Sequence, residues 1–375
     1  MIAKLDRKDY EKVRSLFTEL SEYNAAIPAL LDGINGGWVL VDSVDRPTAA
    51  FAKTVEGYAL AGDSENDSFV AAVNAYLKEN IFNDEHTVNG DGVYMNFHPK
   101  NWESKVASLF HPREPMTLIG RHYLCSELKY TDWREHLPDG FSVHQIDDSL
   151  LDKPGLIIPD NIIEWISGNW GTRQHYLEYG FGFCVVHNDA ISHWSIADCA
   201  TKDGNCEIGI WSTTDHRRKG LAAIAAAAAV EYALSNGFNR VGWHCVDDNV
   251  GSYKTAEKVG FLHKRTRENR YCMVSSVHQI AENGWFHGRN GRSEAATKAY
   301  TQLFAISDDY PHYIYHTAAE AYANVGKKDQ AISCLNMAVD RDWSRLDYTK
   351  SREQFRILHD MSQWDAVLAR MKEKK

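Results

Sequence analysis

Residues 207–222 of the chain read Glu-Ile-Gly-Ile-Trp-Ser-Thr-Thr-Asp-His-Arg-Arg-Lys-Gly-Leu-Ala. This pattern predicts a β-strand, a short basic loop that ends at Gly220, and a helix that begins at once, because an alanine-rich run with strong helix propensity follows. A loop that brings free backbone N–H groups to a helix N-terminus binds anions, most often phosphate. Gly220 lets the backbone approach such a ligand closely, and the preceding Arg217, Arg218 and Lys219 add positive charge.

The sequence after this helix predicts another strand and another short helix. Residues 237–246 give a glycine breaker followed by an apolar strand, and residues 247–252 read Asp-Asp-Asn-Val-Gly-Ser and open a helix. That helix closes with Lys-Val-Gly-Phe at 258–261. The Arg-x-x-Gly-x-Ala spacing at 217–222 is neither a Walker loop nor a dinucleotide-binding fingerprint.

The loop and the helix that runs from Asn249 to Lys-x-Gly-Phe together resemble the GNAT superfamily of N-acetyltransferases. In that family the loop holds the pyrophosphate of acetyl-CoA, so the resemblance implies acetyl-CoA as co-substrate. The residues that it implies for acetyl-CoA binding are Trp211, Ser212, Thr213, Arg217, Arg218, Lys219, Gly220, Leu221, Ala222, Asn249 and Ser252. The Glu-Ile-Gly-Ile and Asp-Asn-x-x-Ser versions of the motifs look like the subfamily that includes the zwittermicin A resistance enzyme, over roughly residues 1–275.

Acetyl transfer to an amine requires a base for the amine, stabilisation of the oxyanion and protonation of the leaving thiolate. The resemblance implies Glu207 as the base, because acidic residues on this strand serve several members; a strand-edge carboxylate that holds a neighbouring group is the alternative. His244 is the second candidate. Many members place a tyrosine seven residues after the asparagine, where this chain has Ala256. Ser252, one turn earlier on the same face, is the nearest donor, and a helix-capping hydroxyl is the alternative.

The composition of the 375-residue chain excludes several classes of protein. A net charge of -10 argues against nucleic-acid binding, which favours a basic surface. The seven cysteines are scattered without a Cys-x-x-Cys pair, which fits reduced thiols in a cytoplasmic protein. We find neither an apolar run suited to a signal peptide or membrane span nor metal-ligand spacing among the 17 histidines, so we expect no membrane association and no metal.

The chain length predicts two or three domains. Residues 136–276 carry the motifs and form the predicted catalytic GNAT domain. Residues 1–135 repeat its order of elements, with strands expected at 38–42, 49–60, 93–97 and 116–125 and helices near 68–79 and 102–110. Acidic residues within 62–67 stand where the basic loop would be and would repel a pyrophosphate. We interpret residues 1–135 as a degenerate GNAT-like α/β domain; an unrelated α/β cap is the alternative.

Residues 277–375 are predicted to be wholly helical. Small and aromatic residues between Tyr315 and Ala338 have the spacing of a tetratricopeptide (TPR)-like helix pair, with Gly326 in the turn. Trp343 departs from the pattern, because such repeats usually have proline there. The segment is either a module for peptide binding or self-association, or a cap that stabilises the rest of the chain.

The predicted fold is therefore α+β with a mixed α/β sheet, in two GNAT-like halves followed by a TPR-like helical bundle. His193, Trp194 and Asp198 are expected on strands that flank the acceptor cleft, with core packing as the alternative for each. The first functional hypothesis is an acetyl-CoA-dependent N-acetyltransferase that acts on a small-molecule amine. The others are an acyl-CoA-binding regulatory protein without catalysis and a protein acetyltransferase that recruits its substrate through the helical tail.

Overall fold

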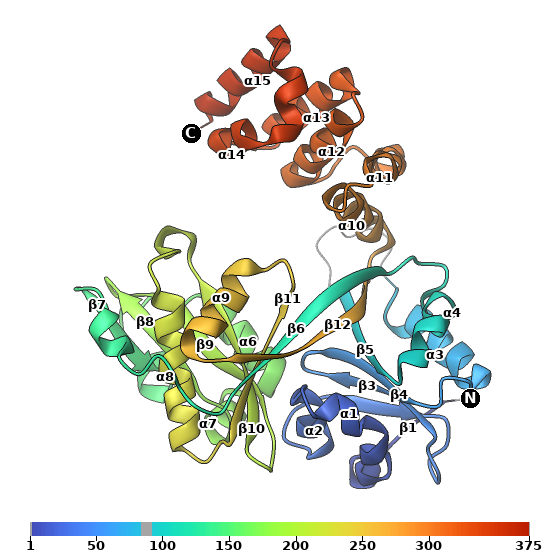
Figure 1. Ribbon diagram of the computed structural model, residues 1–375, viewed down its shortest axis with the longest axis vertical. Coiled ribbons are helices and arrows are strands. Elements are labelled where there is room, and N and C mark those ends of the chain that lie inside the picture. Colours follow the sequence, from blue (N-terminus) through green and yellow to red (C-terminus); the bar gives the residue numbers. More distant parts are fainter. Residues whose placement is uncertain (1, 84–91, 375) are drawn as a thin grey trace. The chain divides into compact units, whose positions relative to one another are not determined.

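The computed structural model describes residues 2–83 and 92–374 of the chain (Figure 1). The chain forms two compact units, one of Met1–Asn74, Tyr94–Leu109 and Thr117–Tyr271, the other of Ala75–Val93, Phe110–Met116 and Cys272–Lys375. The first unit contains strands from both predicted GNAT-like halves. The division into three domains at residues 135 and 276 stays a prediction.

In the described residues, twelve strands form one mixed sheet, which confirms the α+β class. The strands are β1 (Ala3–Lys4), β2 (Trp38–Val41), β3 (Ala49–Thr54), β4 (Gly57–Gly62), β5 (Gly92–His98), β6 (Met116–Cys125), β7 (Phe141–Gln145), β8 (Gly182–His187), β9 (Ala190–Ala200), β10 (Asn205–Ser212), β11 (Arg240–Val246) and β12 (Leu262–Met273). Their order across the sheet is β1-β2-β3-β4-β5-β12-β6-β11-β10-β9-β8-β7.

The helices before residue 272 connect these strands. They are η1 (Arg7–Phe17), α1 (Thr18–Ser21), α2 (Ala26–Leu31), α3 (Asp67–Asn80), η2 (Lys100–Lys105), α4 (Val106–Phe110), η3 (Trp133–His136), α5 (Asp148–Leu151), α6 (Asp160–Trp170), α7 (Arg173–Tyr179), η4 (Thr214–His216), α8 (Leu221–Ser235) and α9 (Val250–Val259). The helical segment at the N-terminus is mostly of the 3-10 type, and its Val13 and Leu20 are buried.

The sheet order reveals an internal duplication. In each half a run of antiparallel strands ends in a parallel pair, β4 with β5 and β10 with β11, and a helix, α3 or α8, connects the two strands of that pair. The last strand of each half is exchanged, because β6 lies beside β11 and β12 lies beside β5. The predicted GNAT-like repeat is therefore present in the topology, and the exchange joins both halves into one sheet.

One predicted strand of the first half is divided in two. Residues 49–60 were expected as a single strand, but they form the hairpin of β3 and β4 around a turn at Val55 and Glu56. The Thr54 side chain closes this turn, since its hydroxyl accepts from the Glu56 N–H and donates to the Gly57 carbonyl, both at 3.2 Å. Gly57 has a φ of +127°, which only glycine adopts readily. The turn places Glu56 at the tip of the hairpin.

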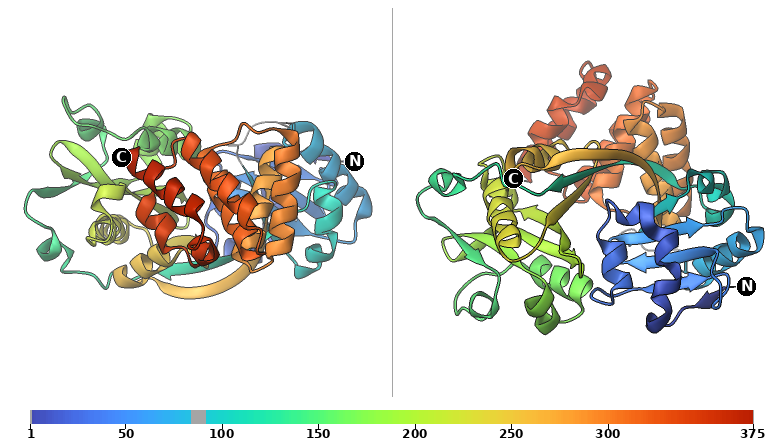
Figure 2. Two further views of the ribbon diagram at one scale, coloured as in Figure 1. Left: turned by 90° about the horizontal axis from the view of Figure 1, so that it is seen from above. Right: turned by 60° about the horizontal axis from the view of Figure 1, so that its bottom comes forward.

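Helix α8 explains the alanine run in the sequence. It packs against β8 and β9 of the sheet (Figures 1 and 2), and residues Ala223 to Val230 are all buried. A helix that is covered on nearly every side lies close to its neighbours only if its side chains are small. The run thus positions the N-terminus of α8, which begins directly after Gly220.

The carboxyl-terminal segment is helical and has its own core. Its helices are α10 (Ser276–Arg289), α11 (Ser293–Ile306), α12 (His312–Asn324), α13 (Lys328–Asp340), α14 (Leu346–Ser351), η5 (Glu353–Leu358) and α15 (Ser362–Glu373). Gly326, with a φ of +77°, turns between α12 and α13, and the Trp343 indole donates to the Thr349 hydroxyl at 3.0 Å. The resemblance to a TPR stays a prediction. In the described part of the chain, none of the helices combines the length and apolar character needed to cross a bilayer.

Candidate active site

The parallel strands β10 and β11 separate along their length. They pair only at Asn205, Cys206 and Glu207, opposite residues 240–242. Beyond Glu207, β10 continues to pair with β9 and β11 with β6, so the edges that face each other are open. A cavity of about 1240 Å³ lies against both of these edges, which is larger than the usual ~300–1,000 Å³ of a small-ligand site. It is large enough for an extended ligand and a second molecule.

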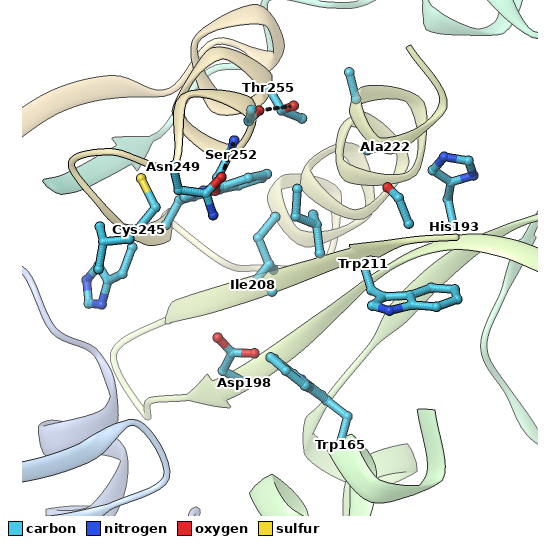
Figure 3. Close-up of a pocket in the computed structure, with 18 of the residues that line it drawn as sticks. Trp165, His193, Asp198, Ile208, Trp211, Ala222, Cys245, Asn249, Ser252 and Thr255 are labelled. Carbon is cyan, nitrogen blue, oxygen red and sulfur yellow. Dashed lines mark hydrogen bonds between the residues drawn. The ribbon is translucent and has the colours of Figure 1, made fainter. Parts of the chain in front are cut away.

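The walls of the cavity come from both halves of the first unit. The lining residues used below are Asn24, Glu56, Tyr94, Asn96 and His122 from the first half and Asn161, Glu164, Trp165, His193, Asp198, Trp211, Ser212, Arg217, Arg218, Gly220, Leu221, Ala222, Trp243, His244, Asn249, Ser252, Lys254 and Lys258 from the second. Figure 3 shows side chains of β9, β10 and α6 on one side of the pocket and those of α9 on the other.

One end of the cavity is suited to an anion. Gly220 is the N-cap of α8, has a φ of +80°, and supplies no side chain to cap the helix. The positive end of the helix dipole therefore faces the lining residues of the loop, which include Arg217 and Arg218. Lys258 adds a third cation, because its Nζ lies 3.6 Å from where a Cβ on Gly220 would be. These are the features that a pyrophosphate requires.

Most of the residues predicted to bind acetyl-CoA line this cavity. They are Trp211, Ser212, Arg217, Arg218, Gly220, Leu221, Ala222, Asn249 and Ser252. Thr213 and Lys219 are not among its lining residues. The Thr213 N–H donates to the Ser192 carbonyl at 2.9 Å, which keeps it in the strand pairing, and the Lys219 Nζ lies 3.1 Å from the His216 ring.

Asn249 and Ser252 have structural contacts as well as a place on the wall. Asn249 caps α9, since its Oδ1 accepts from the Ser252 N–H at 3.2 Å. The indole N–H of Trp243 donates to the Ser252 hydroxyl oxygen at 2.9 Å. Because that oxygen acts as an acceptor here, its hydrogen can point to another group, and the Cys245 thiol is such a hydrogen-bond neighbour. Ala256 is fully buried and has no proton to give.

Glu207 lies at the point where β10 and β11 separate, and it is only 2% exposed. It occupies the space above Gly242, where a Cβ would lie 2.7 Å from the Glu207 Cγ. One carboxylate oxygen accepts from the Ala25 N–H, and the other lies 3.1 Å from His244 Nδ1. Glu207 is not among the cavity-lining residues, so the predicted base is present but lies behind the wall.

A second carboxylate, Glu56, joins this cluster from the β3–β4 hairpin. Its Oε2 also lies 3.1 Å from His244 Nδ1 and accepts from Asn24 Nδ2 at 3.1 Å. His244 Nε2 lies 2.9 Å from the Tyr23 carbonyl, which can only accept, so Nε2 carries hydrogen. Nδ1 therefore faces two carboxylates, and at least one proton must be bound between the three side chains.

Burial and mutual repulsion divide the roles of the two carboxylates. Burial raises the pKa of Glu207 well above its usual range, and the charge of Glu56 raises it further. Burial acts in the same direction on Glu56, but His244 and a hydrogen bond from Glu207 outweigh it and lower the pKa of Glu56 to about 2. Of the two carboxylates, Glu207 therefore binds a proton more tightly, and Glu56 is the one that ionises first. Glu56 and His244 are the members that line the cavity.

The same three side chains are the possible metal ligands of the site. One ligand atom from each of Glu56, Glu207 and His244 lies within 4.8 Å of the others. Hydrogen bonds from the Ala25 N–H and Asn24 already orient the two carboxylates, and a shared proton accounts for their approach to Nδ1. The absence of a metal stays a prediction.

Sequence reasoning missed several residues of this site. Glu56 was assigned to the interior of a strand, although Gly57, which follows it, is a turn signal that could have found the hairpin. Asn24, Tyr94, Asn96 and His122 come from the half that carries no motif. Lys258 belongs to a motif that was recognised, but only its position after the helix was considered. No local signal marks Asn24, Tyr94, Asn96 and His122. They reach the cavity because the exchange of β6 and β12 joins the first half to the second.

Comparisons with known proteins agree with this geometry. A family model described as GNAT acetyltransferase matches residues 14–268. Over 77 residues the chain is 38% identical to the uncharacterized N-acetyltransferase YjdG of Bacillus subtilis (strain 168). This match covers 20% of the chain and 46% of YjdG, so the chain spans about half the length of that curated relative.

A solved structure shows the same fold. A GCN5-related N-acetyltransferase-like protein from Streptococcus suis 89/1591 superposes with a TM-score of 0.52 at 18% identity, over 70% of this chain and 98% of that one. A tandem GNAT protein from the clavulanic acid biosynthesis pathway gives a TM-score of 0.48 at 11% identity, over 73% of this chain and 98% of that one.

Proposed function

Because the chain belongs to the GNAT acetyltransferase family, we propose that it transfers an acetyl group from acetyl-CoA to a primary amine of a small molecule. The observation that carries the proposal is the uncapped N-terminus of α8 beside the open edges of β10 and β11. It supports donor binding and leaves room for an acceptor in the same cavity. Membership of the zwittermicin A resistance-like subfamily stays a prediction.

The donor is held by the β10–α8 loop and by α9. Arg217, Arg218 and Lys258 supply positive charge to the pyrophosphate, and the first N–H groups of α8 add hydrogen bonds. The unpaired backbone edge of β10 from Ile208 to Ser212 pairs with the pantetheine arm as another strand would. Acetyl-CoA supplies an activated carbonyl carbon and a thiolate leaving group.

Glu56 and His244 receive the proton of the amine. An alkyl amine is mostly protonated at neutral pH, so the ionised Glu56 attracts its ammonium form. His244 and Glu207 connect to Glu56 within 4.8 Å, and the three groups bind protons as one unit. In this account Glu207 is a positioning residue, since it acts on the amine through its two neighbours.

The reaction balances with these groups. The ammonium group loses one proton to the cluster, its nitrogen forms a bond to the acetyl carbon and then loses a second proton to solvent, and the carbon–sulfur bond breaks with its electron pair on sulfur. The Ser252 hydroxyl, which accepts from Trp243 and has Cys245 as a further hydrogen-bond neighbour, protonates the sulfur and regains hydrogen from solvent. The cluster releases its proton to solvent, so the products are the amide, CoA and one proton.

The test is CoA release from acetyl-CoA in the presence of a panel of primary amines. Turnover of at least one amine is expected, and Arg217→Ala should raise the KM for acetyl-CoA with little change in kcat, because Arg217 touches only the donor. Tight acetyl-CoA binding without turnover of any amine would contradict the proposal and favour a regulatory acyl-CoA-binding protein. Turnover of polypeptides alone would favour a protein acetyltransferase.

A further inference from the structure

A carboxylate outside the proton-binding cluster faces the acceptor side of the cavity. The pairing of β9 with β10 changes register between Glu207 and Ile208, which pair with Cys199 and Ala197. Asp198 is therefore the extra residue of a β-bulge, a feature that re-aims side chains near active sites. Asp198 lines the cavity, and Figure 3 shows its carboxylate next to the Trp165 ring.

Asp198 has no cation to balance it. Its Oδ1 is buried and has no hydrogen-bond partner in the part of the chain that the structure describes. Burial and the charge of Glu56 raise its pKa well above the usual range, while Trp165 and the Gly209 backbone act in the opposite direction. A buried carboxylate next to another negative charge is stabilised in its ionised form by a cation. None of the ion pairs found among the described residues involves Asp198.

The wall next to Asp198 is aromatic and depends on a glycine. Trp165 packs edge-on against Trp194, with ring centroids 4.9 Å apart. A Cβ on Gly209 would lie 2.3 Å from the Trp165 ring and 3.2 Å from Asp198 Oδ1. Gly209 therefore makes room for the tryptophan and the carboxylate together. An aromatic face beside a carboxylate is a suitable environment for an ammonium group.

Charge is divided between the two ends of the cavity. Its lysines and arginines, Arg217, Arg218, Lys254 and Lys258, are all on the donor side. The acceptor side has the carboxylates of Glu56, Asp198 and Glu164, with Glu164 exposed on α6. A single amine bound at Glu56 would leave Asp198 without a cation, and its raised pKa then favours the neutral acid; a second ammonium group next to Asp198 would favour the ionised form.

We propose that Asp198 and Trp165 form a subsite for a second ammonium group, so that the acceptor is a diamine or polyamine. One amino group meets Glu56 and is acetylated, and the other is held by Asp198. This rests on the proposed function for the reaction and adds the class of acceptor. A neutral amino alcohol tail is the competing occupant, because a hydroxyl can also donate to Asp198.

The experiment compares three acceptors of equal chain length, namely diaminobutane, n-butylamine and aminobutanol, with acetyl-CoA and the full-length protein. The diamine should have the highest kcat/KM, by roughly ten- to a hundredfold over n-butylamine. Asp198→Asn should remove most of this preference by raising the KM for the diamine. Asp189→Asn is the matched control, since it removes one charge from the exposed β8–β9 turn at a φ that asparagine tolerates; it should keep the preference.

Equal use of the three acceptors by the unaltered protein would overturn the subsite, as would an equal loss for all three in Asp198→Asn. A preference for aminobutanol would overturn the ammonium assignment. If no amine is turned over, the proposed function fails while the subsite is still tested by calorimetry with CoA present. The diamine should then bind the unaltered protein at least tenfold more tightly than Asp198→Asn, and equal affinities would overturn the proposal.

Discussion

The β4–α3–β5 segment of the first half and the β10–α8–β11 segment of the second half have the same topology but opposite chemistry at the helix N-terminus. Helix α8 begins after Gly220 without a side-chain cap, beside arginines. Helix α3 is capped by Asn66, whose Oδ1 accepts from the Phe69 N–H at 3.0 Å. Asp67 in its first turn pairs with Lys105 at 3.0 Å. In the first half, side chains of the protein itself therefore bind the N–H groups at the helix N-terminus. In the second half, the corresponding N–H groups are left for a ligand.

The strands differ in the same sense. In the first half β4 and β5 pair from Tyr58 to Ala61, nearly the whole length of β4. In the second half the pairing stops at Glu207 and the cavity begins. In our proposal the first half has no donor site, and its β3–β4 hairpin instead brings Glu56 to His244 of the second half. We therefore propose that one half of the duplicated fold binds the donor and that the other half completes the acceptor side.

The largest effect is expected where the first half enters the site. Glu56→Gln cannot become the anion that attracts the amine, so kcat/KM should fall by roughly a hundred- to ten-thousandfold. Glu207→Gln retains an acceptor for the Ala25 N–H and resembles the protonated acid, so it should lose far less. Steady-state kinetics on both variants measures the two losses in kcat/KM. A larger loss in Glu207→Gln would assign the base to Glu207.

Reversing the charge of the donor site should make the second half resemble the first. Arg217→Glu combined with Lys258→Glu places two carboxylates beside the α8 N-terminus, so the Kd for acetyl-CoA should rise by roughly a hundredfold. The converse change in the first half, Glu65→Lys in the acidic loop, should leave that Kd unaltered. Calorimetric titration measures both. An unchanged Kd in the double variant would place the donor elsewhere.

The pKa of Glu207 predicts a dependence of stability on pH. A raised pKa means that the folded state keeps a proton that the unfolded state loses above the ordinary glutamate range, so this group destabilises the fold as the pH rises toward its folded-state pKa. Glu207→Gln removes this loss of stability, so its free energy of unfolding relative to the unaltered protein should increase as the pH rises above the ordinary glutamate range, by up to about 1.4 kcal/mol per pH unit. Denaturant titrations at several pH values check this. A difference that is constant with pH would contradict it.

The smallest effect concerns the cap of α3. Asn66→Ala removes the acceptor of the Phe69 N–H and should lower the free energy of unfolding by about 1 kcal/mol. The KM for acetyl-CoA should not change, since this helix N-terminus binds no ligand in our account. Urea unfolding measures the change in the free energy of unfolding, and steady-state kinetics measures the KM for acetyl-CoA. A change in KM would show that the first half takes part in donor binding.

The loop that we propose as the donor site could be located in the sequence because its determinants are local. The strand, the basic loop, Gly220 and the helix are contiguous, and each has its own propensity or charge. The α3 loop could likewise be judged unsuitable from its acidic residues. The roles of Thr213 and Lys219 stay predictions from the contiguous motif, and neither residue lines the cavity.

The acceptor side could be predicted only in part, because it depends on contacts distant in sequence. Glu56 meets His244 only because the β3–β4 hairpin turn directs it there. Asp198 was recognised as flanking the cleft, but its exposure to the cavity follows from a bulge in the strand register. Register and strand exchange are properties of the assembled sheet, and no window of sequence contains them.

The central claim is that one half binds the donor and the other completes the site. Calorimetric titration of the full-length protein with acetyl-CoA tests it most directly. The account predicts one acetyl-CoA per chain, with that binding severely weakened by Arg217→Glu combined with Lys258→Glu and unaffected by Glu65→Lys. A stoichiometry of two per chain, or binding that survives the double variant, would contradict it.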